Sequence, residues 1–365
     1  MHKFTLGIEE EFQILDGDTL KLRSHMSKIL EGGKVLLKER IKEEMHQSVV
    51  EMGTNVCENI QEARDEVSYL RQQVIDLAAK EGLKVAAAGT HPISNWSEQL
   101  ITNNPRYDEL IAEMKDVARS NLIFGMHVHV GIPNREEGLH IMNVARYFLP
   151  HLYALSTNSP FWEARETGFK SFRSKIFDKF PRTGIPPYFS SVAEYDKFVD
   201  ILVETHCIDN GKKIWWDIRL HPFYPTVEFR VCDMMMTVDE VTCIAAIMQC
   251  IIAKLSKLHS KNQSFRSYRR ILINENKWRA ARWGIEAKLI DFGKEEEVPF
   301  AILIQELLEF IDDVVDDLGC RTEVNYVYQM LEQGSGADRQ LKVFEETGDL
   351  KEVVKYIVEQ TAKGL

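Results

Sequence analysis

The stretch Phe4-Thr-Leu-Gly-Ile-Glu-Glu-Glu-Phe-Gln-Ile14 sets the fold, because its apolar and polar residues alternate. The apolar positions are Phe4, Leu6, Ile8, Phe12 and Ile14, and the polar positions are Thr5, Gly7, Glu9, Glu11 and Gln13. Residues two apart in a β-strand lie on the same face. The stretch therefore predicts a strand with one buried face and one polar face.

Four other segments predict further strands, and the last three of them show the same alternation. They are residues 47–54, 122–132, 213–220 and 224–232. In residues 122–132, His127 and His129 lie opposite a row of apolar side chains. In residues 224–232, Glu228 and Arg230 share one face, and Glu51 lies in the segment 47–54. We expect all these polar groups on one face of a sheet.

Half-polar strands favour an antiparallel or mixed sheet that is covered by helices on one face. A doubly wound parallel sheet would show continuous apolar runs instead. Helical periodicity marks several segments, namely residues 58–80, 138–156, 238–260, 298–318 and 349–362. We therefore predict an α+β fold with a largely antiparallel, curved sheet, one polar face and helices on the other face. Because no Pro/Gly/Ser-rich linker divides the chain, we expect a single domain over residues 1–365.

Composition and charge exclude some partners. The 365 residues carry a net charge of −11, which argues against a nucleic-acid binder but permits ATP if cations lie between the charges. The six cysteines form no C-x-x-C pair, which indicates reduced thiols in a cytoplasmic protein. The N-terminus lacks the apolar core of a signal peptide, and no window approaches a membrane span of ~18 apolar residues. We expect a cytoplasmic protein without membrane contact.

The two glutamates of the first strand suggest a metal site. Two carboxylates ~4 Å apart repel by about 4 kcal/mol at an effective dielectric constant of 20. A divalent cation between Glu9 and Glu11 would remove that repulsion, and oxygen-rich sites suit magnesium. The alternative is a solvated edge strand with surface glutamates.

The other polar pairs fit the same chemistry. The spacing of His127 and His129 is compatible with zinc, with manganese or with a magnesium-bound phosphate, and does not choose among them. Glu228 offers a carboxylate to a metal, and Arg230 offers a guanidinium to a phosphate or carboxylate. The alternative for that pair is a cross-strand ion pair worth under about 1 kcal/mol.

No phosphate-binding loop of the form G-x-x-x-x-G-K-[ST] occurs in the sequence. If ATP is used, metal carboxylates and arginines must hold it. A single face with glutamates, histidines and arginines is what a site for a metal and a polyphosphate needs.

These motifs resemble a known family. Gly7-Ile-Glu-Glu-Glu-Phe12 is similar to the G-x-E-x-E-[FYW] opening of the YbdK-type carboxylate–amine ligases, relatives of type 2 glutamate–cysteine ligase. The resemblance continues, in the order of the family, through residues 51–57, 89–92, 125–131, 154–156, 159–163, 167–168, 171–173, 227–233, 276–279 and 334–340. Met234-Met-Met236 departs from the shorter, more polar turn of the family and leaves the shape of that loop open.

The resemblance implies a glutamine-synthetase-like catalytic sheet that curves around ATP and Mg²⁺, with Mn²⁺ as a substitute. The metal ligands that it implies are Glu9, Glu11, Glu51, His127 and Glu228. It also implies that Arg230 contacts phosphate, that Arg173 contacts a carboxylate or phosphate, and that Arg279 contacts the cofactor.

The activity that the resemblance implies is amide formation. ATP phosphorylates a carboxylate, an amine attacks the acyl phosphate, and ADP and phosphate leave. The expected substrates are glutamate, or another carboxylate, and cysteine, or another amine, with slow turnover if the natural amine is not cysteine. Two alternatives stay open from the residues alone: a metal-dependent hydrolase and a catalytically inactive nucleotide-binding protein. The sequence is compatible with a homo-oligomer.

Overall fold

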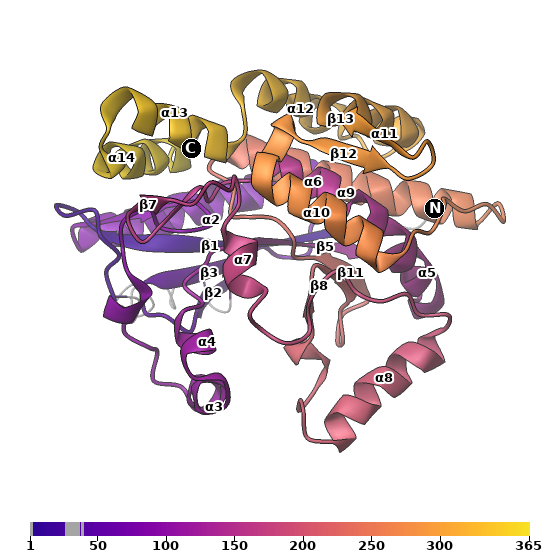
Figure 1. Cartoon of the computed structure of the whole chain (residues 1–365), viewed down its shortest axis with the longest axis horizontal. Coiled ribbons are helices and arrows are strands. Elements are labelled where there is room, and N and C mark those ends of the chain that lie inside the picture. The colour runs from indigo at the N-terminus through magenta and orange to yellow at the C-terminus, as the bar shows by residue number, and fades with distance from the viewer. Residues whose placement is uncertain (1–2, 26–36, 38–39) are drawn as a thin grey trace.

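The computed structural model describes residues 3–25, 37 and 40–365 (Figure 1). Within these residues the centre is a seven-stranded sheet in the order β10-β11-β5-β1-β3-β2, with β4 also paired to β1. Its strands are β1 (Leu6–Asp16), β2 (Ile41–Glu43), β3 (Val49–Gly53), β4 (Leu83–Ala86), β5 (Met126–Gly131), β10 (Ile218–Leu220) and β11 (Thr226–Phe229). Every pairing in this sheet is antiparallel, which confirms the predicted fold class.

Helices cover one face of the sheet, as Figure 1 shows. The helices on this side are α2 (Ile60–Lys80), α5 (Arg135–Ala145), α6 (Leu149–Leu155), α9 (Val238–His259), α10 (Arg270–Trp283), α11 (Phe300–Val315), α12 (Arg321–Gln333), α13 (Gly336–Thr347) and α14 (Leu350–Thr361). Shorter excursions project on the opposite side and carry α3 (Pro105–Met114), α4 (Asp116–Arg119), α7 (Arg173–Phe177) and α8 (Val192–Glu204). The polar face therefore opens between the excursions.

Short elements complete the described chain. The two-stranded ribbons are β6 (Phe161–Trp162) with β7 (Arg165–Glu166), β8 (Thr183–Gly184) with β9 (Trp215–Trp216), and β12 (Lys288–Asp291) with β13 (Glu296–Pro299). The 3₁₀ helices are η2 (Trp96–Glu98), η3 (Arg146–Phe148), η4 (Gly211–Lys213) and η5 (Gly284–Glu286).

Two predicted elements are divided in the structure. The strand predicted over 213–220 splits, because β9 pairs with β8 in parallel and only β10 joins the central sheet. The helix predicted over 138–156 is interrupted by η3, and α6 restarts with Pro150 in its first turn. Proline lacks an amide hydrogen and is tolerated in a helix only near its start. The helices predicted over 58–80, 238–260, 298–318 and 349–362 are confirmed apart from their ends.

The register of the sheet gathers the polar side chains. Glu11 lies opposite Glu51, and Glu9 lies opposite His127. On the next strand pair, Glu228 lies opposite His129. Because paired residues in antiparallel strands share a face, these groups from four strands project to the same side.

Glu10 is the exception on the apolar face. Its carboxylate is 2% exposed and accepts hydrogen bonds from Arg71 of α2, with an Nη2–Oε1 distance of 2.6 Å. Arg71 also donates to the carbonyl oxygens of Met235 and Met236, at 3.0 and 2.6 Å. Through these hydrogen bonds Arg71 holds the loop at Met234–Met236, whose shape the sequence left open. It also connects α2 to this loop and to β1.

Helix α9 packs across the middle of the covered face. It begins with a capping box in which Thr237 and Glu240 satisfy each other's backbone amides. By length and composition α9 resembles a membrane span, with a mean hydropathy of 1.6, so the expectation that no window approaches one is wrong. In this fold 78% of that apolar window is buried inside the protein.

Candidate active site

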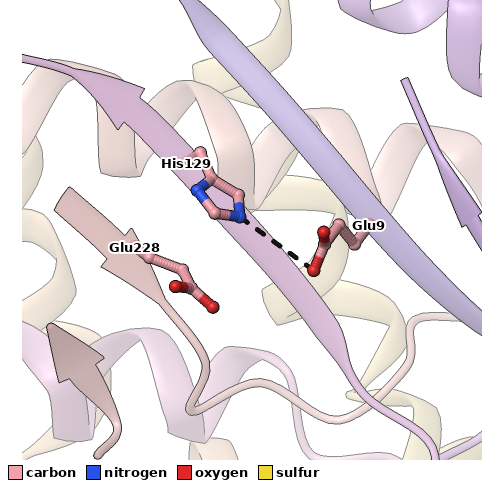
Figure 2. Close-up of side chains that lie close together, drawn as sticks. All are labelled: Glu9, His129 and Glu228. Atoms are coloured by element: carbon pink, nitrogen blue, oxygen red, sulfur yellow. Dashed lines mark ion pairs between the residues drawn. The ribbon is translucent and has the colours of Figure 1, made fainter. Parts of the chain in front are cut away.

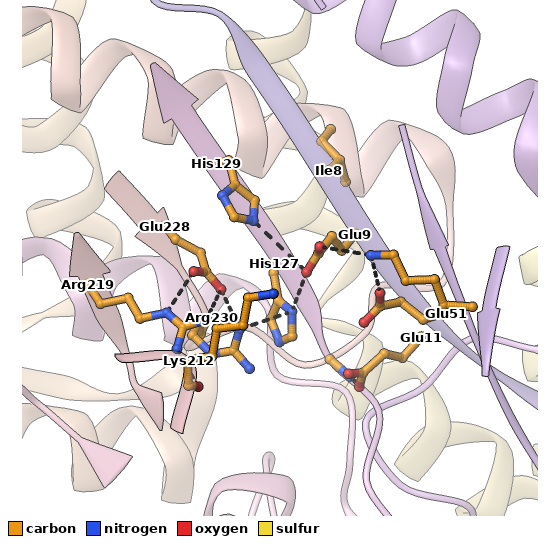
Figure 3. Close-up of polar contacts among 12 residues, drawn as sticks. Ile8, Glu9, Glu11, Glu51, His127, His129, Lys212, Arg219, Glu228 and Arg230 are labelled. Carbon is orange, nitrogen blue, oxygen red and sulfur yellow. Dashed lines mark hydrogen bonds and ion pairs between the residues drawn. The ribbon is translucent and has the colours of Figure 1, made fainter. Parts of the chain in front are cut away.

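A cavity of about 410 Å³ lies on the polar face of the sheet. The predicted residues Glu9, Glu11, Glu51, His127, Glu228, Arg173 and Arg230 all line it. Figure 3 shows most of them converging from β1, β3, β5 and β11. An aromatic wall formed by Tyr107, Phe177, Phe180 and Trp215 closes another side. The structure therefore brings together every predicted site residue except Arg279.

Two clusters of ligand atoms form in the cavity, and each has the dimensions of a metal site. The first joins Glu9, His129 and Glu228, which Figure 2 shows side by side. The second joins Glu11 and Glu51 with Glu44, a residue that sequence reasoning missed. Within each cluster the ligand atoms lie within 4.8 Å of one another. Oxygen-rich sets with at most one imidazole fit magnesium or manganese.

The second cluster concentrates negative charge in a buried place. Burial, together with repulsion from Glu51, raises the pKa of Glu11 to about 7, although Arg173 acts in the opposite sense. Burial and the two neighbouring carboxylates raise the pKa of Glu44 well above its usual value. The Gly125 amide donates to Glu11 at 2.5 Å and fixes that carboxylate in the cavity. A bound cation would relieve the repulsion within this group.

Glu9 lies between the two histidines. His127 Nδ1 is 3.2 Å from Glu9 Oε2, and His129 Nε2 is 4.0 Å from the same oxygen. Burial acts to raise the pKa of Glu9, but the two imidazoles together lower it well below its usual value. Lys42 Nζ lies 3.6 Å from Glu9 and 2.9 Å from Glu51, so one ammonium group spans both clusters.

Glu228 is held between two arginines. Arg219 Nε lies 2.7 Å from Glu228 Oε2, and Arg230 pairs with the other oxygen. Although burial opposes ionisation, these guanidinium groups lower the pKa of Glu228 far below its usual value. Burial and the Arg230 charge also lower the pKa of His127 to about 4, which keeps this imidazole neutral at pH 7.

Two buried guanidinium groups in the cavity have unsatisfied donors. Among the described residues, the Nε atoms of Arg173 and Arg230 have no hydrogen-bond partner. Arg173 is 4% exposed, and its Nη1 donates a long hydrogen bond to the Arg230 carbonyl oxygen at 3.5 Å. Buried polar groups without a partner are rare in native proteins and call for an explanation. Both guanidinium groups line the cavity and carry positive charge that favours an anionic ligand there.

A buried carboxylate positions Arg173. Asp233 accepts hydrogen bonds from the Asn158 amide at 2.8 Å and from the Ser159 and Ser171 hydroxyls at 2.7 and 2.8 Å. Ser159 Oγ in turn accepts the Arg173 amide at 3.1 Å. Three motifs that are distant in the sequence therefore meet at Asp233, outside the cavity, and hold the arginine in it.

The structure does not bring Arg279 into this cavity. Arg279 lies on α10, 3.3 Å from Glu275, and also pairs with Glu297. Its motif in residues 276–279 serves packing instead, since Asn276 bonds the backbone of Ile290 in both directions. A helical arginine could point anywhere from its sequence position, and here it points away.

Sequence reasoning missed His221, which lines the cavity. Its Nδ1 accepts the amides of Phe223 and Tyr224 at 3.3 and 2.9 Å, so Nε2 must carry the proton in the neutral ring. The same geometry occurs at His91, whose Nδ1 accepts the amides of Ile93 and Ser94. The repeated His-Pro dipeptide was a signal that could have identified His221.

Comparisons with known proteins identify the family of this chain. The family model of glutamate–cysteine ligase family 2 matches residues 5–356. The chain is 57% identical to "Putative glutamate--cysteine ligase 2" of Solibacter usitatus (strain Ellin6076), over 99% of this chain and 94% of that protein. It is 52% identical to the protein of the same name from Sorangium cellulosum (strain So ce56), over 100% and 97%.

Solved structures share the fold. The glutamate–cysteine ligase of Francisella tularensis in complex with AMP has a TM-score of 0.72 at 13% identity, covering 99% of this chain and 90% of that chain. A bifunctional glutathione synthetase from Pasteurella multocida has a TM-score of 0.71 at 15% identity, covering 98% and 52%. The curved sheet, the clustered carboxylates and the match over nearly the whole length lead to one conclusion: this chain belongs to glutamate–cysteine ligase family 2, a family of ATP-dependent carboxylate–amine ligases.

Proposed function

We propose that this protein joins glutamate to cysteine through a γ-glutamyl phosphate and releases ADP and phosphate. The observation that carries the proposal is the pair of carboxylate clusters beside two guanidinium groups with free donors in one cavity. The names of the relatives support the choice of substrates. A second amine in place of cysteine would use the same chemistry.

The residues of the cavity fit two divalent cations. Glu9, Glu228 and an imidazole would hold one, and Glu11, Glu44 and Glu51 would hold the other. The resemblance assigned His127 as the imidazole ligand, whereas the distances favour His129, with His127 orienting Glu9. Bound magnesium or manganese would neutralise the phosphate oxygens and polarise the terminal phosphoryl group.

The arginines and aromatic residues of the cavity would have separate roles in the reaction. Arg173 and Arg230, which both line the cavity, would donate hydrogen bonds from their guanidinium groups to the anionic oxygens as charge shifts during phosphoryl transfer. The aromatic wall, where Phe180 and Trp215 pack edge to face at 5.6 Å, would keep water from the acyl phosphate. Cations held by these carboxylates would stabilise charge on the terminal phosphoryl group, which favours ADP over AMP as the product.

The proposal is tested by incubating the protein with ATP, Mg²⁺, glutamate and a panel of amines that includes cysteine. We expect ADP, phosphate and a new amide by mass spectrometry, each dependent on both the acid and the amine. AMP as the nucleotide product would overturn the acyl-phosphate route. Bound ATP without any amide would instead support a nucleotide-binding protein.

A metal-dependent hydrolase is the second candidate, because His127, His129 and His221 share the cavity with several carboxylates. It predicts substrate cleavage without ATP, which the same assay detects when ATP is omitted. Within either function we propose that the 365 residues work as one domain, since most buried apolar residues of the described chain form one core. We also propose that the protein works in the cytoplasm, because its cysteines form no C-x-x-C pair and are those of a reduced protein.

A further inference from the structure

A second cavity, of about 420 Å³, lies outside the proposed active site and shares no lining residue with it. It lies between η3, the segment before α8 and the start of α10. The side chains that matter for its chemistry are Arg146, Arg269, Arg270, Tyr188, Tyr268 and Ser267. Among the residues that the structure describes, no acidic side chain lines it, although the chain as a whole carries a net charge of −11. The cavity is therefore locally cationic.

Arg146 is a buried cation without an anion. It is 1% exposed, and it donates to the carbonyl oxygens of Asn143 and Pro186 at 2.8 and 2.9 Å. Among the described residues no carboxylate lies within ion-pair distance of it. Burial and the nearby Arg270 lower its pKa to about 10. Fully buried arginines are almost always paired, so this charge lacks its counterpart.

The first turn of α10 adds positive potential to the same cavity. The helix begins at Arg270, its N-cap Arg269 makes no side-chain cap, and its first turn holds no acidic residue. The free amides at a helix N-terminus carry partial positive charge and favour anions. Two arginines at this end raise the potential further, against the usual preference for Asp or Glu. A bound anion would offset both features.

The tyrosines give the cavity an organic lining. The Arg146 guanidinium carbon lies 5.7 Å from the centre of the half-exposed Tyr188 ring. Tyr268, in the segment just before α10, packs against Tyr147 with ring centres 5.2 Å apart. A ligand with an oxyanion and a small organic body would meet both arginines and aromatic rings in this lining.

We propose that this cavity is a second ligand site, which binds a small molecule through a phosphate or carboxylate group held by Arg146, Arg270 and the α10 N-terminus. The site lies apart from the reacting groups, so it binds its ligand whether or not the proposed ligase activity is correct. The shared chemistry is the oxyanion, which inorganic phosphate and succinate can each supply.

The test is hydrogen exchange of the full chain in inorganic phosphate, in succinate and in chloride at equal ionic strength. At ten times its dissociation constant, a bound anion should slow opening of its site about tenfold. We expect this slowing in peptides that cover residues 184–189 and 266–273. If the site selects one anion, only phosphate or only succinate should slow exchange there. Neither anion slowing exchange there would overturn the proposal.

Variants separate the site from general salt effects. Arg270→Gln should abolish the local slowing, and Arg146→Lys should weaken it if that variant folds. Arg282→Gln removes the same charge from the other end of α10 and should keep the slowing. Equal slowing in Arg270→Gln and in the unchanged protein would show adventitious binding and would overturn the site.

Discussion

Glu11 lies in a buried part of the cavity together with Glu44 and Glu51, so three carboxylates are close to one another there. Their closest oxygens lie within 4.8 Å of one another. At that separation two unit charges repel by roughly 3 kcal/mol at an effective dielectric constant of 20. The metal-free protein therefore stores repulsion that a bound cation would release.

This repulsion leads to a prediction with opposite signs for stability and activity. Glu11→Gln should raise the free energy of unfolding in EDTA by roughly 1–3 kcal/mol, because it removes one charge from the cluster. It should lower ATP turnover by about 100-fold or more, because one cation loses a ligand. Thermal unfolding in EDTA and in magnesium, with an assay of ADP release, measures both effects.

Glu359→Gln is the control, since it removes the same charge from an exposed position. It should change neither the unfolding temperature nor the rate. A Glu11→Gln variant that is less stable than the unchanged protein in EDTA would contradict the stored repulsion. A variant that keeps full activity would remove Glu11 from the metal site.

Asp233 acts on the active site through Arg173 rather than by touching substrate. Asp233→Asn replaces an acceptor oxygen with a donor where three donors already converge. We expect a loss of roughly 2–4 kcal/mol in stability and a fall in kcat larger than the change in KM for ATP. Urea unfolding and steady-state kinetics give the two numbers.

A graded variant separates positioning from simple destabilisation. Ser171→Ala removes one of the three donors and should cost about 1 kcal/mol with most of the activity kept. If Asp233→Asn stays folded at the assay temperature with unchanged kcat, Asp233 does not position Arg173.

At the scale of elements, helix α2 is attached to strand β1 by a buried ion pair. Arg71 is 0% exposed and is the partner of Glu10 on the apolar face of the sheet. Arg71→Met leaves the Glu10 charge buried and alone, so we expect a loss of about 3–5 kcal/mol. Adding Glu10→Leu to this variant should recover a large part of that loss. Urea unfolding of the single and double variants measures the coupling.

The same helix offers a control. Arg64 pairs with Asp239 at a partly exposed place, with side-chain exposures of 27% and 47%. Arg64→Met should cost less than Arg71→Met, because solvent screens the pair with Asp239 and the contact with Glu323 is longer, at 3.7 Å. Equal losses for Arg64→Met and Arg71→Met would mean that burial does not decide the strength of these pairs.

At the scale of the whole molecule, buried histidines set the acid limit of the fold. Burial lowers the pKa of His46, His91 and His151 from 6.5 to about 4. In the unfolded chain these three imidazoles become protonated near pH 6.5. In the folded chain they become protonated only near pH 4. Stability is therefore fully present above pH 6.5 and is lost as the pH falls towards 4.

Each such histidine should cost roughly 3 kcal/mol across that window. In His91→Asn the side-chain oxygen can still accept the amides of Ile93 and Ser94, but the group no longer titrates. We expect a flatter dependence of urea stability on pH between 4 and 6.5 in this variant. The same slope as in the unchanged protein would show that His91 is not part of the acid limit.

The alternation in residues 4–14 and 122–132 determined the strands, the polar face and most of the cavity, because the side-chain period of a strand is a local property. The carboxylates and imidazoles on that face followed from the same period. Tertiary structure alone decided which strands are neighbours, and hence that Glu11 meets Glu51 and that Glu228 meets His129.

Tertiary structure also added Glu44, Arg219 and His221 to the cavity and turned Arg279 away from it. The local sequence around each of these residues does not predict whether its side chain lines the cavity. A loop carboxylate or a helical arginine has no fixed direction until another element packs against it, whereas a strand residue has only two faces to choose from. The sequence therefore determined which polar groups lie on the open face of the sheet. The tertiary structure decided which loop and helix residues complete the cavity on that face.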